Sequence, residues 1–459
     1  MNEKQRPGLF APVDVAILVY YRIAFGVLMM ISIALYFATC QIEGRWIGLT
    51  YHFTYMGFGW VRPWPGDGMY VHFIALGVLS LFITLGFCYR LSMALFFVGY
   101  THAFLIDSTY NLNHAYLTCL IAFLMIFVPA HGALSIDAWL RPALRVATAP
   151  AWGLFLLRAQ MGLVYFFGGI AKLNLDWLQG YPLRYWLRGQ AELGPLVTAE
   201  WGIRFFSYGG LLFDLLVVPL LLWRRTRPYA FAVAAAFHLM NHYFFTHIAI
   251  FPFLAIATTA LFFPSDWPRR FARWLRPAGA SVPPAAPAAP GPSPRARLAV
   301  AAFVWIYLAI QIALPLRHWC YPGNPSWTEE GNFFAWRMML SSKAGTCTFR
   351  VRDGATGQEW EVHPYRKLAF RQAYEMMEHP DRILQFAHQL ASELRAQGYE
   401  QIEVRADTKA SLNGREYQAL IDPTVDLAKQ PRTWRHYAWI VPHTAPHSPK
   451  HEHRKGAQP

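Results

Sequence analysis

Two ionisable residues, His114 and Lys172, stand in otherwise apolar parts of the chain and are the first candidates for chemistry. His114 follows the polar stretch DSTYNLN between two apolar runs, and Lys172 ends the run VYFFGGIAK. An ionisable group in or beside a bilayer core is costly, so it is a functional hypothesis by default. Burial disfavours the ammonium form of a lysine, and the free amine can act as a base. Taken alone, Lys172 is also typical of a membrane-surface anchor, and His114 of a helix cap.

The composition indicates a polytopic membrane protein. Of 459 residues, 55% are hydrophobic and only 15% are charged, which is below the share usual in soluble chains. The net charge is +14, but the arginines collect in short clusters beside apolar runs, as at Arg224, Arg225 and Arg227. That pattern is typical of membrane topology, so we expect no nucleic-acid partner. The five cysteines form neither a CxxC pair nor a zinc spacing, so we expect no metal site and no dithiol redox chemistry.

Nine apolar segments come near the length needed to cross about 30 Å of hydrocarbon. They lie at residues 15–37, 69–87, 91–106, 115–130, 153–170, 205–223, 229–245, 248–264 and 298–316. The sequence therefore predicts a polytopic α-helical membrane protein of about nine spans.

The distribution of Arg and Lys favours a cytoplasmic N-terminus, because most of them then fall on inside segments. An odd number of spans puts the C-terminal part outside. Arg22 and Arg158 lie close to cytoplasmic ends, and we expect their long side chains to reach the membrane surface. This orientation predicts a multi-pass protein of a bacterial inner membrane, or of the ER membrane in a eukaryote.

The same orientation places His114 and Lys172 at one outward face. Other polar residues fall at this face, and we expect four of them to support the pair: Asp107, Asn113, Asp214 and His238. Asp214 could equally be a buried structural acceptor. His238 could form an interhelical hydrogen-bond pair with Asn241.

The composition changes after residue 316, which predicts two domains. Residues 1–316 form the membrane domain, with a Pro/Ala-rich inside linker at 277–294, and residues 317–445 form an extramembrane α+β domain. In the second domain we expect a hairpin that turns at 354–357, a helix over 370–397 broken near Pro380, and a strand at 401–406. Residues 446–459 are expected to be a disordered tail.

Short motifs along most of the chain resemble those of the vitamin K-dependent γ-glutamyl carboxylases and their bacterial relatives, which have a membrane domain of the HTTM type. The motifs are GFCYR at 86–90, FLID at 104–107, NHAY at 113–116, KLNLDWLQGY at 172–181, GGLLFD at 209–214, FHLMN at 237–241, DWPR at 266–269, SWT at 326–328, FAWRMM at 334–339 and IDPTVD at 421–426.

The resemblance implies carboxylation of protein glutamate to γ-carboxyglutamate, coupled to epoxidation of reduced vitamin K by O2. In that family a lysine base deprotonates the naphthohydroquinone, and the oxygenated product removes the γ-proton of a glutamate, which then captures CO2. Lys172 matches the lysine base, and His114 matches the histidine that assists the later steps. The partners implied are a glutamate-containing protein or peptide and membrane lipid, with no metal. Beside the polar cluster we expect a quinone cavity lined by Tyr165, Phe166, Trp177, Tyr181 and Asn241.

The chain departs from the vertebrate pattern at Ala171, where that pattern has a second lysine, and in its shorter C-terminus. The alternative function is a non-catalytic multispan module that binds a lipid or a quinone. Both His114 and Lys172 stand in matching context, which favours the enzyme. A vitamin K epoxide reductase is disfavoured because it would need a paired-cysteine motif.

Overall fold

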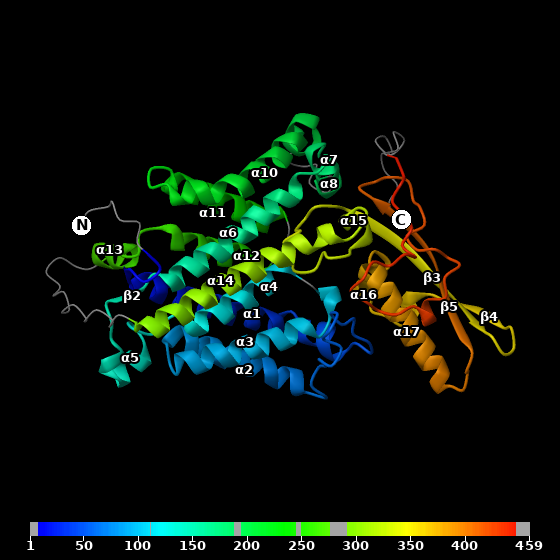
Figure 1. Ribbon diagram of the computed structural model, residues 1–459, viewed down its shortest axis with the longest axis horizontal. Helices are drawn as coiled ribbons and strands as arrows, with labels where there is room; N and C mark the ends of the chain where they lie inside the picture. Colours follow the sequence, from blue (N-terminus) through cyan, green and yellow to red (C-terminus); the bar gives the residue numbers. More distant parts are fainter. Residues whose placement is uncertain (1–7, 111, 188–193, 245–248, 276–291, 447–459) are drawn as a thin grey trace.

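All nine apolar segments contain helices in the computed structural model of the protein, which describes residues 8–110, 112–187, 194–244, 249–275 and 292–446. These helices are α1 (Ala16–Ala38), α2 (Gly68–Leu85), α3 (Tyr89–Leu105), α4 (Asn113–Phe127), α6 (Trp152–Lys172), α10 (Glu200–Leu222), α11 (Arg227–Phe244), α12 (Phe251–Thr259) and α14 (Pro294–Leu316). They form an elongated bundle, with the C-terminal region at one end (Figure 1). The predicted linker at 277–294 and tail at 446–459 lie almost wholly outside the described residues.

Five helices of the described chain are long and apolar enough to cross a membrane: α1, α2, α6, α10 and the stretch Pro294–Cys320 that contains α14. Others are shorter. Helix α4 has 15 residues and is about 22 Å long, and α12 has 9 residues followed by a 3-10 turn at Ala260–Phe262. The protein is therefore a helical membrane protein, while the finer prediction of nine spans is not confirmed.

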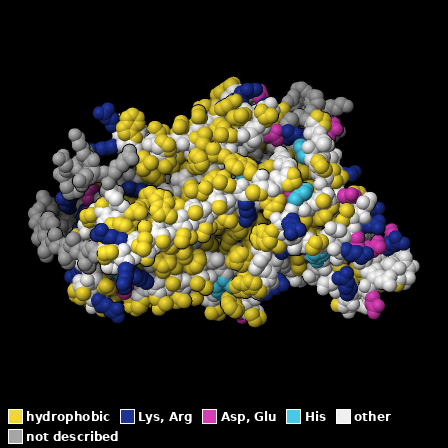
Figure 2. Space-filling view, in the orientation of Figure 1, with side chains coloured by type: hydrophobic (Ala, Val, Ile, Leu, Met, Phe, Trp, Pro, Cys, Tyr) yellow, Lys and Arg dark blue, Asp and Glu magenta, His cyan; other side chains and the backbone are white. Residues whose placement is uncertain are grey.

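Apolar side chains cover much of the bundle surface, and Lys and Arg gather toward its ends (Figure 2). Large hydrophobic side chains such as Leu91, Val98 and Ile306 are 60%, 62% and 61% exposed, which suits contact with lipid rather than with water. Inside the bundle, glycine brings helices close. A Cβ on Gly26 of α1 would lie 2.8 Å from the backbone nitrogen of Thr84 in α2.

The prediction that Arg22 reaches the membrane surface is wrong. Its side chain is fully buried and donates hydrogen bonds to the carbonyl oxygens of Ala130 (2.8 Å) and Leu134 (2.5 Å). Arg158 similarly donates to the carbonyl oxygens of Leu261 (2.7 Å) and Phe263 (3.0 Å). Arg22 thus binds the loop that follows α4, and the half-buried Arg158 binds the chain around the 3-10 turn after α12, so both side chains hydrogen-bond within the protein.

Short elements connect the long helices. They are β1 (Pro12–Asp14), β2 (Thr148–Pro150), α5 (Ile136–Leu140), α7 (Leu175–Leu178), α8 (Tyr181–Trp186), α9 (Pro195–Thr198), α13 (Trp267–Trp274) and α15 (Pro325–Thr328). Strands β1 and β2 pair antiparallel, and α5 and α13 lie at the end of the bundle away from the C-terminal region (Figure 1). Helices α7 and α8 lie at the opposite end, immediately after Lys172.

The C-terminal region contains an antiparallel sheet in the order β4-β3-β5, with helices beside it. Its elements are β3 (Lys343–Asp353), β4 (Glu359–Val362), α16 (Phe370–Met377), α17 (Pro380–Ala396) and β5 (Ile402–Leu412). Alternate residues of β3, including Phe349 and Val351, point into a core shared with α17. The predicted hairpin and the helix break before Pro380 are confirmed, and β5 is longer than the predicted strand.

Loops of the membrane bundle pack into this C-terminal region. Phe53, between α1 and α2, is fully buried in the C-terminal core. Asp107 accepts a hydrogen bond from Gln372 of α16 (2.8 Å). On the other side, Asp176 of α7 forms an ion pair with Arg415 (2.6 Å). These contacts fix the C-terminal region over the end of α6 that carries Lys172.

Candidate active site

Lys172 is buried at the last position of α6 and faces α10. Its Nζ lies 2.6 Å from Oδ2 of Asp214 and 3.3 Å from the carbonyl oxygen of Gly168. Both charged residues are only 7% exposed. Gly168 makes room for the carboxylate, because a Cβ there would lie 3.1 Å from Asp214 Oδ2. The site is therefore a buried ion pair, and the desolvation cost of such a pair is repaid only by close geometry.

Trp177 of α7 covers the pair. The Lys172 Nζ lies 5.2 Å from the centre of its ring, within the range of a cation–π contact. The ring is held in place because Trp177 Nε1 donates to the carbonyl oxygen of Ser207 (2.9 Å), and the Ser207 hydroxyl donates to the carbonyl oxygen of Trp177. These two hydrogen bonds fix the Trp177 ring over the Lys172 amine.

His114 belongs to a second group of residues, which makes no direct contact with Lys172 or Asp214 among the described contacts. It lies in the first turn of α4, and its ring stacks on Phe251 at 5.6 Å between centres. Phe251 in turn meets His238 edge to face at 5.8 Å, and His238 Nε2 lies 2.7 Å from the hydroxyl of Tyr165 in α6. The structure thus connects His114 through Phe251 to His238 and Tyr165, and Tyr165 lies two helical turns before Lys172 in α6.

The two groups are linked through α10. Phe213, next to Asp214 in sequence, contacts the Tyr165 ring at 5.6 Å and the His238 ring at 6.0 Å. His238 Nδ1 is buried and has no hydrogen-bond partner among the described residues. Depending on the tautomer, this nitrogen can donate a hydrogen bond to a hydroxyl group of a bound ligand or accept one from it. The hydroxyl of Tyr165 is already engaged by His238 and lies 3.3 Å from Thr259 Oγ1.

The remaining predicted residues lie outside these contacts. Asp107 accepts hydrogen bonds from Thr109 and Gln372, so it helps to dock the C-terminal region. Tyr181 lies in α8 beneath the guanidinium of Arg184, 4.9 Å away. Three others are not enclosed: Asn113 and Asn241 are half-buried, and Phe166 is 50% exposed on the outside of α6.

The segment 333–340 also lies at the site, although the sequence did not predict it there. The methyl group of Met338 would lie 3.8 Å from a Cβ on Gly168, and Trp336 stacks on Tyr116 of α4 at 4.9 Å. The segment therefore runs between the helices that carry Lys172 and His114. Phe334 and Trp336 have φ values of 64° and 56°, a left-handed conformation that is costly for bulky residues and concentrates at functional sites. The sequence signal for this segment was the motif FAWRMM at 334–339, which belongs to the family resemblance.

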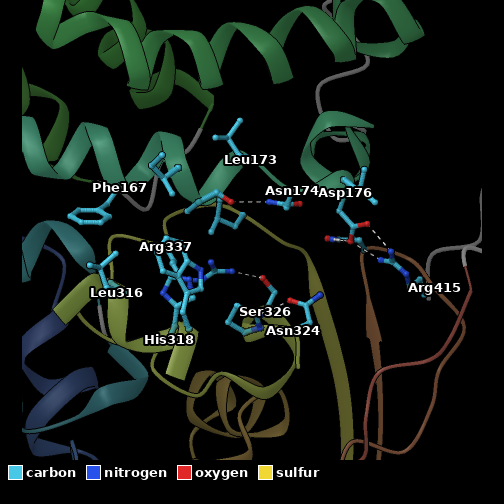
Figure 3. A pocket seen from close by; sticks show the side chains of 18 residues that line it. Phe167, Leu173, Asn174, Asp176, Leu316, His318, Asn324, Ser326, Arg337 and Arg415 are labelled. Atoms are coloured by element: carbon cyan, nitrogen blue, oxygen red, sulfur yellow. Dashed lines mark hydrogen bonds and ion pairs between the residues drawn. The ribbon is translucent and has the colours of Figure 1, made fainter. Parts of the chain in front are cut away.

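A cavity of about 620 Å³ opens beside α6, between the bundle and the C-terminal region (Figure 3). Its lining includes Phe167, Ile170 and Ala171 of α6, together with residues of 316–340 and the turn that follows β5. The lining comes from the face of α6 next to Lys172, and Tyr165, Phe166, Trp177 and Tyr181 do not contribute to it. In the part of the chain that is described, no group of three or more His, Cys, Asp or Glu side chains is placed to hold a metal ion.

Comparison with known families agrees with this architecture. The HTTM domain model matches residues 10–267, which is more than half of the chain. The model for the lumenal domain of vitamin K-dependent gamma-carboxylase matches residues 296–446. No solved structure matches the chain. The two matches follow one another as the helical bundle and the C-terminal region do, and the chain belongs to the vitamin K-dependent γ-carboxylase family.

Proposed function

We propose that this protein carboxylates glutamate side chains of a protein or peptide substrate, using reduced vitamin K, O2 and CO2. The observation that carries the proposal is the buried Lys172, whose Nζ lies 2.6 Å from Asp214 Oδ2. Its motif KLNLDWLQGY resembles the one in which the carboxylases have their lysine base. An anchoring lysine would extend to the membrane surface, whereas this side chain turns into the protein. Burial and a proton acceptor at contact distance are what a lysine base requires.

The residues around the pair suit a hydroquinone. His238 Nδ1 is a buried polar atom without a partner in the described chain, and the rings of Phe213 and Phe251 beside it offer apolar surface. A hydroquinone with an apolar tail would reach such a site laterally from the lipid. When bound and oxygenated, reduced vitamin K supplies the strong base that removes the γ-proton of glutamate.

Lys172 and Asp214 would manage the first proton together. The resting pair holds one dissociable proton, either on Nζ or, 2.6 Å away, on Asp214 Oδ2. With the proton on Asp214, Lys172 would be a free amine and could take a proton from a bound hydroquinone hydroxyl. The Trp177 ring, 5.2 Å from Nζ, would stabilise the ammonium so formed. Asp214 is thus a catalytic partner as well as a structural acceptor. His114, which Phe251 and His238 connect to Phe213 beside Asp214, would act on the later carbanion or CO2 step.

We also propose the orientation and the domain division. The N-terminus is cytoplasmic, and the chain divides near residue 316 into a membrane domain and an extramembrane domain on the outer side. Support comes from the arginine bias of the sequence, from the two separate hydrophobic cores and from the lumenal name of the matched C-terminal family model.

The direct test is to incubate purified protein in nanodiscs with reduced vitamin K, O2, labelled bicarbonate and a glutamate-containing peptide. We expect label in the peptide and vitamin K epoxide in a fixed ratio, and neither product with Lys172→Ala. A variant that forms no product but regains activity with a small external amine would support the base role. A quinone-binding module would bind the hydroquinone and give neither product, which would refute the proposal.

A further inference from the structure

Arg337 is a cation without a counter-ion in the wall of the large cavity. Its Nη2 donates to Ser326 Oγ (3.0 Å), and its Nε is buried with no acceptor among the described residues. No Asp or Glu of the described chain forms an ion pair with it. Glu329, the carboxylate whose charge acts on Arg337, is already engaged by Lys343 (3.5 Å) and Asn332 (2.5 Å). Burial lowers the pKa of Arg337, and the nearby Glu329 charge offsets this only in part.

The other charged groups of the cavity wall neutralise one another. Asp176 receives two hydrogen bonds from the Arg415 guanidinium (2.6 and 2.7 Å) and one from Asn413 (2.6 Å). Figure 3 shows this pair on one side of the cavity, apart from Arg337 and Ser326. His318 uses its Nδ1 on the carbonyl oxygen of Pro315 (2.6 Å). The described wall therefore presents one unmatched positive charge, from Arg337.

The position of Arg337 ties the cavity to the Lys172 site. Its neighbour Met338 lies against Gly168, one turn before Lys172, and its neighbour Trp336 stacks on Tyr116 of the helix that begins with Asn113 and His114. Ala171 and Leu173, on either side of Lys172 in sequence, both line the cavity. A group bound by Arg337 is thus held beside the segment that carries the base.

We propose that Arg337 binds the side-chain carboxylate of the glutamyl residue that is to be modified, and that the cavity holds the peptide around it. This inference rests on the proposed function. A guanidinium fork matches the planar carboxylate, and a volume of about 620 Å³ is within the range of ligand sites. Asn324 in the wall accepts a hydrogen bond from the backbone nitrogen of Ser326 with its Oδ1 (2.9 Å), and its amide N–H groups can donate to a peptide carbonyl. Pockets for anionic lipid headgroups are built from several basic residues, whereas Asp176 balances the second arginine here.

The test is direct peptide binding by the full-length protein in phosphatidylcholine nanodiscs, without hydroquinone. The probes are a fluorescein-labelled peptide with blocked termini and a single glutamate, and the same peptide with glutamine instead. We expect the protein to prefer the glutamate peptide. Arg337→Gln should weaken binding of that peptide about tenfold to a hundredfold, with little effect on the glutamine peptide, because a charge-assisted hydrogen bond is lost. Arg337→Lys should be intermediate, since it keeps the charge without the fork.

Arg350→Gln is the matched control, because Arg350 pairs with Asp407 on the exposed side of the sheet and should not affect binding. Equal affinity for the two peptides, or unchanged selectivity in a folded Arg337→Gln protein, would overturn the inference. So would loss of peptide binding in nanodiscs that contain phosphatidylglycerol, which would assign Arg337 to a lipid headgroup. Selective binding that depends on Arg337, without carboxylated product under assay conditions, would count against the proposed function and support this inference.

Discussion

Removing one member of the Lys172–Asp214 pair should destabilise the protein far more than removing both. Lys172 Nζ and Asp214 Oδ2 are 2.6 Å apart and both side chains are 9% exposed, so Asp214→Leu alone leaves an ammonium with neither solvent nor counter-ion. Breaking a buried pair in this way costs about 3–5 kcal/mol. The double variant Lys172→Met with Asp214→Leu replaces the pair by apolar groups and should stay within about 1 kcal/mol of the wild type or exceed it.

The assay is a double-mutant cycle by reversible SDS-induced unfolding in mixed micelles. A second cycle on Arg350 and Asp407, whose side chains are 48% and 44% exposed, serves as the control and should give about 0.2–1 kcal/mol. A coupling energy for Lys172 and Asp214 no larger than this control would refute the reasoning. It would mean that the two groups are solvated in the membrane protein, and Asp214 would lose its role as the partner that holds the proton of Lys172.

Three further predictions address the site, the C-terminal region and the orientation. Lys172→Arg should form neither epoxide nor carboxylated peptide, because a guanidinium stays protonated, whereas His114→Ala should reduce labelled bicarbonate incorporation more than epoxide formation; equal loss of both products would contradict the order of steps. Burial raises the pKa of Glu378 from 4.5 to about 8, so the folded protein holds a proton there that the unfolded chain releases, and this contribution to stability is lost as pH rises through that window. Glu378→Gln removes the titration, and its Tm relative to wild type should therefore rise as the pH is raised from about 5 to about 8; a difference independent of pH would show that Glu378 does not titrate there. A reporter that is active only in the periplasm should be active when fused after residue 445. Activity of a cytoplasmic reporter at the same position would contradict the proposed orientation.

The sequence predicted the elements because their signals are local. Hydropathy located all nine helices, since an apolar run of helical length has few other stable forms in a membrane. The glycines at 354 and 357 marked the β3–β4 turn, and Pro380 marked the break between α16 and α17, because both residue types restrict the backbone where they stand. The family motifs singled out Lys172 and His114 in the same way, residue by residue.

The tertiary structure alone decided which groups meet. Asp214 stands 42 residues from Lys172, and hydropathy places both toward the outer face without saying that α10 packs its carboxylate against that amine. Asp107 looked like a member of the same cluster but binds Gln372, 265 residues away. The position of Arg22 near a helix end predicted an exposed side chain. Instead the side chain is buried and donates hydrogen bonds to the carbonyl oxygens of Ala130 and Leu134. Periodicity shows which face of a helix is apolar or polar, whereas the neighbour that satisfies a buried charge is chosen by the packing of the whole bundle.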